Sequence, residues 1–159
     1  MVPTGARVQL APIDRHNWRG ALAVQVTADQ LPYVAGHQPV ALVILAKSYV
    51  RPGGLDWEPL AVTVEGSVVG VVALAHGRTH SEVFHLTVDV SRQRQGVGSA
   101  AVDALVSHVA ATRPDAQQIR LTTHPENEPA QRLYRSRGFL PNGELRDGEP
   151  VWSLALTSR

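Results

Sequence analysis

The sequence predicts a mixed α/β fold in which helices cover both faces of one central sheet. Residues 60–75 contain two runs rich in β-branched side chains that a short turn separates, as in a β-hairpin. Residues 97–112 repeat apolar side chains at helical spacing. The expected order along the chain is strand, helices, three strands, helix, strand, helix and two strands. Helices that alternate with strands in this way pack on both faces of a sheet.

The first part of the chain predicts one strand and two helices. Residues 7–12 alternate in the manner of a strand. Thr27, followed three residues later by Gln30, fits a capping box and predicts a short helix from about Ala28. The apolar run of residues 39–49, opened by a proline, suits a buried helix.

The middle of the chain predicts a loop and three strands. Residues 51–59 are rich in proline and glycine, which indicates a loop. The hairpin strands are expected at residues 60–64 and 68–75, with a turn at 65–67. A third strand is expected at residues 82–90, because β-branched and aromatic side chains return there.

The last third of the chain predicts two helices and three strands. The helical spacing that begins at residue 97 ends at Arg113, which precedes a proline. Residues 118–123 read as a strand. Asn127 suits the N-cap of a second helix, and Gly138 ends it. Residues 139–156 read as a terminal β-hairpin.

The composition excludes several classes of protein. A chain of 159 residues with 43% apolar and 18% charged residues can build its own core, so we expect one domain over residues 1–159. Fifteen basic and fourteen acidic residues nearly cancel, which gives no electrostatic case for a nucleic-acid or membrane partner. The longest apolar run, residues 40–46, is too short to span a bilayer, and the first residues do not resemble a signal peptide. We therefore expect a cytoplasmic protein.

The absence of cysteine restricts the chemistry further. Disulfides, thiol nucleophiles and Cys-ligated metal sites are excluded together. The seven histidines show no spacing typical of metal ligands, so we expect no metal site.

Two glycines lie in a candidate phosphate-binding turn between a strand and a helix. The turn reads Gln93, Arg94, Gln95, Gly96, Val97, Gly98 and Ser99. Glycine lets the backbone approach a ligand, and the free N–H groups at a helix start attract a pyrophosphate. A tight connection without a ligand is the alternative. A dinucleotide fingerprint would need an acidic residue after the next strand, and a Walker loop would need a lysine; both are missing here. Coenzyme A remains as the third phosphate ligand.

Two motifs resemble the signatures of the GNAT acetyltransferase superfamily. QRQGVG at residues 93–98 fits the Gln/Arg-x-x-Gly-x-Gly signature. NEPAQRLYRSRGF at residues 127–139 is similar to the second signature, Asn-x-x-Ala-x-x-Leu-Tyr-x-x-x-Gly-Phe. The resemblance covers residues 60–156 and implies a mostly antiparallel GNAT sheet and an acetyl-CoA-dependent N-acetyltransferase. More loosely, DQLPYVAG and GELRDGEPVWSL resemble bacterial polyamine acetyltransferases.

The resemblance also implies how acetyl-CoA is held. The backbone of Leu86, Thr87 and Val88 is expected to pair with the pantetheine arm as an added strand would. The turn from Gln93 to Ser99 is expected to hold the pyrophosphate through its amides. Asn127 matches the family position that hydrogen-bonds the cofactor arm, and this role is compatible with a helix cap.

Tyr134 in the second motif is the candidate general acid. Without cysteine a route through a protein thiol is excluded, so direct attack of the amine within a ternary complex is the simplest mechanism. A phenol with a pKa near ~10 is protonated at neutral pH and can donate to the leaving thiolate. Packing on an amphipathic helix is the alternative role for Tyr134.

Two residues compete for the role of general base. Glu82 lies eleven residues before Gln93, a spacing that matches the glutamate base of histone-type GNAT enzymes. His85 has a reference pKa near ~6.5, which suits proton removal at neutral pH. Strand alternation would place Glu82, Phe84 and Leu86 on one face and His85 on the other. A water relay without a single base is the third alternative.

The acceptor is expected to be a primary amine of a small molecule, with a polyamine as the first candidate. Polyamine-type relatives generally carry arginine where His85 stands, which leaves the acceptor open. A cationic acceptor would meet one of four acidic residues that are otherwise ordinary loop charges: Asp56, Glu58, Glu144 and Glu149. The alternatives are an aminoglycoside or other amine-bearing antibiotic, a peptide α-amine, or a non-catalytic acyl-CoA-binding module. Many relatives dimerise, so a homodimer is also considered.

Overall fold

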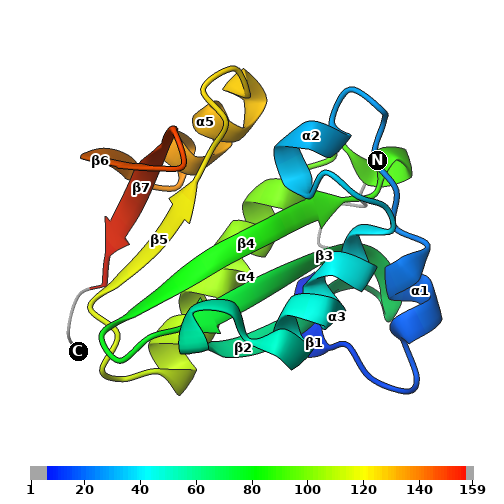
Figure 1. The fold of residues 1–159 in the computed structure, drawn as a ribbon. Coiled ribbons are helices and arrows are strands. Elements are labelled where there is room, and N and C mark those ends of the chain that lie inside the picture. The colour runs from blue at the N-terminus through cyan, green and yellow to red at the C-terminus, as the bar shows by residue number, and fades with distance from the viewer. Residues whose placement is uncertain (1–6, 157–159) are drawn as a thin grey trace.

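The computed structural model describes residues 7–156 as one seven-stranded sheet covered by helices (Figure 1). The strand order is β1-β2-β3-β4-β5-β7-β6, and all neighbours pair antiparallel except β4 and β5. The strands are β1 (Val8–Pro12), β2 (Asp56–Val64), β3 (Ser67–His76), β4 (His80–Val88), β5 (Gln118–Thr122), β6 (Leu140–Arg146) and β7 (Glu149–Ala155). The predicted fold class, a mostly antiparallel mixed sheet, is therefore confirmed.

Helices lie on both faces of this sheet. They are α1 (Trp18–Leu22), α2 (Leu31–Val34), α3 (Val40–Val50), α4 (Val97–Thr112) and α5 (Glu128–Ser136), with short 3₁₀ turns η1 (Pro52–Gly54) and η2 (Val90–Arg92). Val71 of β3 packs in the apolar cluster with α1 and α3, whereas the next residue, Val72, packs in the cluster with α4. Successive residues of a strand point to opposite faces, so β3 supplies both cores. No helix within residues 7–156 is long and apolar enough to cross a membrane.

The sequence prediction was wrong at three places in the first sixty residues. Helix α1 was not predicted. Helix α2 begins at Leu31 rather than at about Ala28, although the Gln30 side chain does accept a hydrogen bond from the Thr27 N–H at 3.2 Å. Residues 28–30 form a turn instead. Strand β2 begins at Asp56, inside the predicted loop, because Trp57 is buried against α3 and pairing with β3 extends that far.

The third predicted strand is displaced by two residues at each end. It was expected at residues 82–90 and is found as β4, His80–Val88. The neighbouring strand approaches β4 closely at Gly70, where a Cβ atom would lie 2.5 Å from the Thr87 carbonyl oxygen. Only glycine fits there without a shift of the backbone. The turn and second strand of the first hairpin, α4, β5, α5 and the terminal hairpin lie where they were predicted.

Candidate active site

A β-bulge in β4 changes the direction of the side chains at the centre of the sheet. Thr87 lies opposite Val71 of β3, and Phe84 lies opposite Ala73, so two residues of β4 face a single residue of β3. His85 is one of these two and has a φ of 59°. The bulge lies in the middle of the strand that was predicted to carry both the cofactor and the base.

The bulge overturns the predicted alternation of side chains. Val83 and Leu86 both pack on the α4 side, whereas Phe84 packs on the α3 side. Phe84 and Leu86 therefore do not share a face, contrary to the sequence prediction. The extra residue restarts the two-residue period, which the sequence alone does not reveal.

Strands β4 and β5 pair at one end and separate at the other (Figure 1). Only the segments His80–Glu82 and Gln118–Arg120 are in register. Thr87 faces β3, and the Asp89 N–H donates to the Val69 carbonyl at 2.8 Å, so Leu86 and Val88 direct their backbone groups away from β3. The β5 side of this part of β4 is the edge predicted to hold the pantetheine arm.

The candidate phosphate-binding turn, residues 93–99, ends at the first turn of α4. Gly96 has a φ of 83° and is the N-cap, and the first bond of the helix runs from the Ala100 N–H to the Gly96 carbonyl. The amides at positions 97–99 therefore have no partner within the helix. The Val97 side chain is buried in the core, so only its backbone can face a ligand.

Two side chains fix this turn in place. The Asp89 carboxylate accepts hydrogen bonds from the N–H of Gln25 and from the N–H and hydroxyl of Ser91. Although partial burial opposes the change, these hydrogen bonds lower the pKa of Asp89. The Gln93 side chain pairs with the Gln30 amide at 2.9 and 3.0 Å and donates to the Val88 carbonyl. Gln93 thus ties the turn to α2 and β4.

Three cavities lie side by side under α2. The first, about 300 Å³, runs between α2 and α5, and among its lining residues are Leu86, Thr87, Val88, Gln93, Arg94, Gly98 and Asn127. The second is a narrow space of about 70 Å³ beside Tyr134, and the third, about 290 Å³, extends toward β7. Tyr33 and Val34 line all three, so α2 is a wall common to them. Of the predicted cofactor residues, Gln95, Gly96, Val97 and Ser99 do not line the first cavity.

The narrow cavity brings together three polar side chains. Tyr134 is only 8% exposed and packs edge-on against Phe139, and burial raises the pKa of Tyr134 to about 12. The Thr123 hydroxyl is buried and has no hydrogen-bond partner within residues 7–156. Asn127 accepts a hydrogen bond from the Ala130 N–H at 3.4 Å, which confirms its predicted role as an N-cap. The phenol stays protonated throughout the neutral range, as a proton donor must.

His85 lines the narrow cavity and the third cavity, with both ring nitrogens engaged. Nδ1 lies 2.5 Å from the Val34 carbonyl, to which it donates. Nε2 lies 2.7 Å from Lys47 Nζ. Burial lowers the pKa of His85, and the charge of Lys47 lowers it further, against the opposing effect of the Val34 hydrogen bond. His85 therefore lines two cavities without a free ring nitrogen.

Glu82 lies outside these three cavities. Its carboxylate accepts hydrogen bonds from Arg146 at 2.6 and 3.0 Å, and His80 lies 3.3 Å away. The side chain is 7% exposed. The two candidate bases, Glu82 and His85, are therefore not brought together, and only His85 reaches a cavity.

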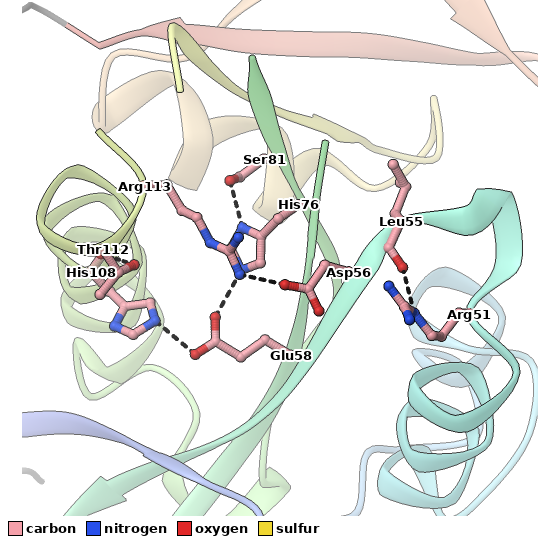
Figure 2. Close-up of polar contacts among 9 residues, drawn as sticks. All are labelled: Arg51, Leu55, Asp56, Glu58, His76, Ser81, His108, Thr112 and Arg113. Atoms are coloured by element: carbon pink, nitrogen blue, oxygen red, sulfur yellow. Dashed lines mark hydrogen bonds and ion pairs between the residues drawn. The ribbon is translucent and has the colours of Figure 1, made fainter. Parts of the chain in front are cut away.

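Of the four acidic candidates for the acceptor, only Glu149 lines the third cavity. Asp56 pairs with Arg113 at 2.7 Å, and Glu144 is exposed on β6. Glu58 lies between His76 and His108 on the α4 side of the sheet (Figure 2). Within residues 7–156 no group of three or more His, Asp or Glu is arranged to hold a metal ion.

Sequence reasoning missed three residues at the site. Lys47 gave one signal, since it is the only lysine in the chain. Thr123 and Arg146 gave none, because a threonine at a strand end and an arginine in a turn are common. Their contacts depend on segments that meet only in the folded chain.

Comparison with known proteins supplies the context of this site. The model of the Acetyltransferase (GNAT) family matches residues 26–139. No curated protein matches the chain. Among solved structures, aminoglycoside acetyltransferase AAC(6')-Ib in complex with paromomycin and acetyl-CoA is 18% identical, with a TM-score of 0.75 over 94% of this chain and 93% of that one.

Two further structures are similar over most of their length. Spermidine N-acetyltransferase from Vibrio cholerae, in complex with CoA and spermine, is 15% identical with a TM-score of 0.71, over 94% of this chain and 95% of that one. Mycobacterium smegmatis RimJ in complex with CoA-disulfide is 20% identical with a TM-score of 0.68, over 94% and 85%. At this identity the likenesses establish the fold.

Proposed function

Because this chain belongs to the GNAT family of acetyltransferases, we propose that it transfers an acetyl group from acetyl-CoA to a primary amine of a small molecule. The amine attacks directly within a ternary complex, since the chain has no cysteine to carry the acetyl group. The observation that carries this proposal is the row of cavities from the glycine turn past Tyr134 to Glu149.

The residues of the first cavity fit acetyl-CoA. The free amides at positions 97–99 lie at the positive end of α4, which suits a pyrophosphate. The edge of Leu86 and Val88 is not paired with β5 and suits the amides of a pantetheine arm, although the Val88 carbonyl also accepts from Gln93. The unpartnered Thr123 hydroxyl in the next cavity offers a polar group to the end of that arm. When bound there, acetyl-CoA supplies the activated acetyl group.

Tyr134 is the proton donor in this proposal. Its raised pKa keeps the phenol protonated, and its position in the narrow cavity lies between the cofactor side and the acceptor side. A thiol with a pKa near ~8.5 is a stronger acid than this phenol. Tyr134 therefore acts by donating a hydrogen bond to the developing thiolate and sharing its proton with it.

No single side chain is assigned as the general base. The Glu82 carboxylate is held by Arg146, and both nitrogens of His85 are in hydrogen bonds. These contacts favour the water relay, in which the amine loses its proton to solvent in the third cavity. Glu149, on the wall of that cavity, receives the incoming amine.

The experiment that tests the proposal is a screen of amines with acetyl-CoA that measures free thiol release. The panel contains an alkyl diamine, a polyamine, an aminoglycoside and a short peptide with a free α-amine. Thiol release that depends on one of these amines supports the acetyltransferase. If CoA binds in calorimetry but no amine promotes thiol release, the non-catalytic acyl-CoA-binding module replaces it.

A further inference from the structure

Lys47 is a half-buried cation next to the proposed acceptor site. It lies on α3, and its Nζ lies 2.7 Å from His85 Nε2. The same atom lies 5.7 Å from the centre of the Trp57 ring and 5.5 Å from that of Phe84. Burial lowers the pKa of Lys47. The chain has no other lysine, and the proposed mechanism gives this one no role.

Lys47 and His85 share one positive charge. His85 donates from Nδ1 to the Val34 carbonyl, so its Nε2 is the acceptor for the Lys47 ammonium. A second proton on His85 would place two cations in contact in a partly buried place, which is unfavourable. The pair therefore carries a single charge, separated from the third cavity by one imidazole ring.

No carboxylate within residues 7–156 forms an ion pair with this charge. The elements packed against α3 are α1, β2, β3 and β4. Their titratable or charged groups other than His85 are engaged elsewhere or lie apart: Arg19 over Trp18, Asp56 with Arg113, Glu58 with His76 and His108, and Glu82 with Arg146 and His80. The aromatic rings of Trp57 and Phe84 hold the ammonium through their faces instead.

The third cavity therefore has a cation behind one wall and a carboxylate on the other. His85, backed by Lys47, stands on β4, and Glu149 stands on β7. The remaining titratable group on that cavity is Tyr33. Glu149 favours an entering ammonium, whereas the Lys47 charge favours the neutral amine that attack requires.

On the premise of the proposed function, we infer that Lys47 acts through His85 to lower the basicity of the bound acceptor amine, which allows a strongly basic alkyl amine to lose its proton in the site. The ammonium proton leaves to water, and the neutral amine then forms the bond to the acetyl carbon while the bond to sulfur breaks. A unit charge about 7 Å away at an effective dielectric constant of about 20 would lower the pKa of the amine by about one to two units.

This charge acts most strongly on basic acceptors. At pH 7.5 an α-amine with a pKa near ~8 is about one quarter neutral, whereas an alkyl amine near ~10.4 is about one part in a thousand neutral. A shift of one to two units raises the neutral fraction of the α-amine by about three- to fourfold and that of the alkyl amine by about ten- to ninetyfold. A compound with several ammonium groups also meets repulsion from Lys47. A simple alkyl amine is therefore the acceptor that gains most from Lys47.

The test compares pH profiles of thiol release for four proteins. Wild type, Lys47→Met, Lys47→Arg and Glu149→Gln are assayed with acetyl-CoA and either alanyl-glycyl-glycine or butylamine. We expect the acidic limb of kcat, which reports the bound complex, to move up by about one to two pH units in Lys47→Met, to stay in place in Lys47→Arg, and to move down in Glu149→Gln. At pH 7.5 Lys47→Met should lower kcat by about three- to fourfold with the tripeptide and by about ten- to ninetyfold with butylamine.

A second measurement detects the charge of Lys47 without enzyme turnover. In an NMR titration the His85 imidazole should take up a proton at higher pH in Lys47→Met than in wild type, because a neighbouring cation is removed. An unmoved imidazole titration, an unmoved acidic limb, or equal shifts in Lys47→Met and Lys47→Arg would overturn the inference while thiol release still supports the acetyltransferase. Absence of thiol release with any amine, together with the expected shift of His85, would overturn the proposed function and with it the role of Lys47 toward an acceptor, while leaving the Lys47–His85 charge coupling in place.

Discussion

The two ends of β4 differ in how their polar groups are used. At the His80 end, the strand pairs on both sides and its polar side chains have partners. The Ser81 hydroxyl lies 2.7 Å from His76 Nδ1, His76 Nε2 lies 2.8 Å from Glu58, and the other oxygen of Glu58 lies 2.9 Å from His108 (Figure 2). The cluster of Glu58, His76, Ser81 and His108 thus joins β2, β3, β4 and α4 in one hydrogen-bonded chain.

At the Val88 end, several polar groups have no partner. Strand β5 has separated from β4, the amides at positions 97–99 have no helical acceptor, and the Thr123 hydroxyl is buried without a hydrogen bond within residues 7–156. Unpaired buried polar groups cost free energy, so a fold retains them where a ligand pairs with them. Polarity alone therefore does not mark the site. The cluster at the His80 end resembles a catalytic triad in composition, but its side chains are hydrogen-bonded to one another, whereas the Thr123 hydroxyl and the amides at positions 97–99 lie without such partners at the other end.

The largest expected effect is on turnover at the open end. Replacing Tyr134 by Phe keeps the edge-on packing against Phe139 but removes the proton donor. We expect kcat to fall by about 10²–10⁴-fold with little change in CoA affinity. Steady-state thiol release and calorimetry measure the two quantities. Parental turnover would reduce Tyr134 to a packing residue.

The next effect is on binding at the same end. Gly98→Asp adds a negative charge beside the proposed pyrophosphate, and we expect CoA affinity to fall by about 10²–10³-fold. Gly98→Ala is the matched control, because its Cβ would lie 3.4 Å from the Leu133 side chain, a contact that a small adjustment can accept. Calorimetry with CoA should show a large loss for Asp and a small one for Ala. Equal affinities in all three proteins would contradict the phosphate-binding role of the turn.

At the opposite end a substitution should change stability and leave binding intact. Hydrogen bonds from His76 and His108 lower the pKa of Glu58 below its ordinary value of 4.5, although burial opposes this. Its stabilising effect is therefore present above that pH and is lost as the pH falls. Glu58→Gln should reduce the free energy of unfolding at pH 7 by about 1–3 kcal/mol. In urea unfolding between pH 3 and 7, the free energy of unfolding should fall less at acidic pH in the variant than in wild type, while CoA affinity stays the same.

The smallest effect on catalysis is expected at Glu82, which belongs to the hydrogen-bonded end. Glu82→Gln weakens the contact with Arg146 and should lower stability, but kcat and the acidic limb of the pH–rate profile should not move. The measurement is the profile of thiol release in variant and wild type. A limb that shifts toward the pKa of the amine itself would restore Glu82 as the base and erase the distinction between the two ends.

The sequence predicted the parts of the site that a continuous segment builds. The turn 93–99, the cap at Asn127 and the position of Tyr134 on α5 each depend on neighbours within a few residues, so the motifs locate them. Helix and strand periods likewise predicted the sheet and its covering helices, apart from the short α1 and α2. Such short helices are set by tertiary contacts more than by their own pattern.

The electrostatics of the site could not be predicted in the same way. Lys47 meets His85 across 38 residues of sequence, and Arg146 meets Glu82 across 64. Each pairing occupies, with a cationic side chain, an atom through which the candidate base would accept a proton. The bulge at His85 also breaks the alternation that was expected to place Glu82 and His85 on opposite faces. Spacing in the sequence gives no information about such long-range partners.

Helix α2 is hydrogen-bonded at both ends to parts of the molecule that we propose bind different substrates. Gln30, just before the helix, pairs with Gln93 of the glycine turn, and the carbonyl of Val34, its last residue, accepts from His85 on the acceptor side. A ligand that shifts one fastening also acts on the other through this four-residue segment. On the proposed function the affinities for acetyl-CoA and for the amine would then be linked, and by thermodynamic necessity each ligand would change the affinity of the other by the same factor.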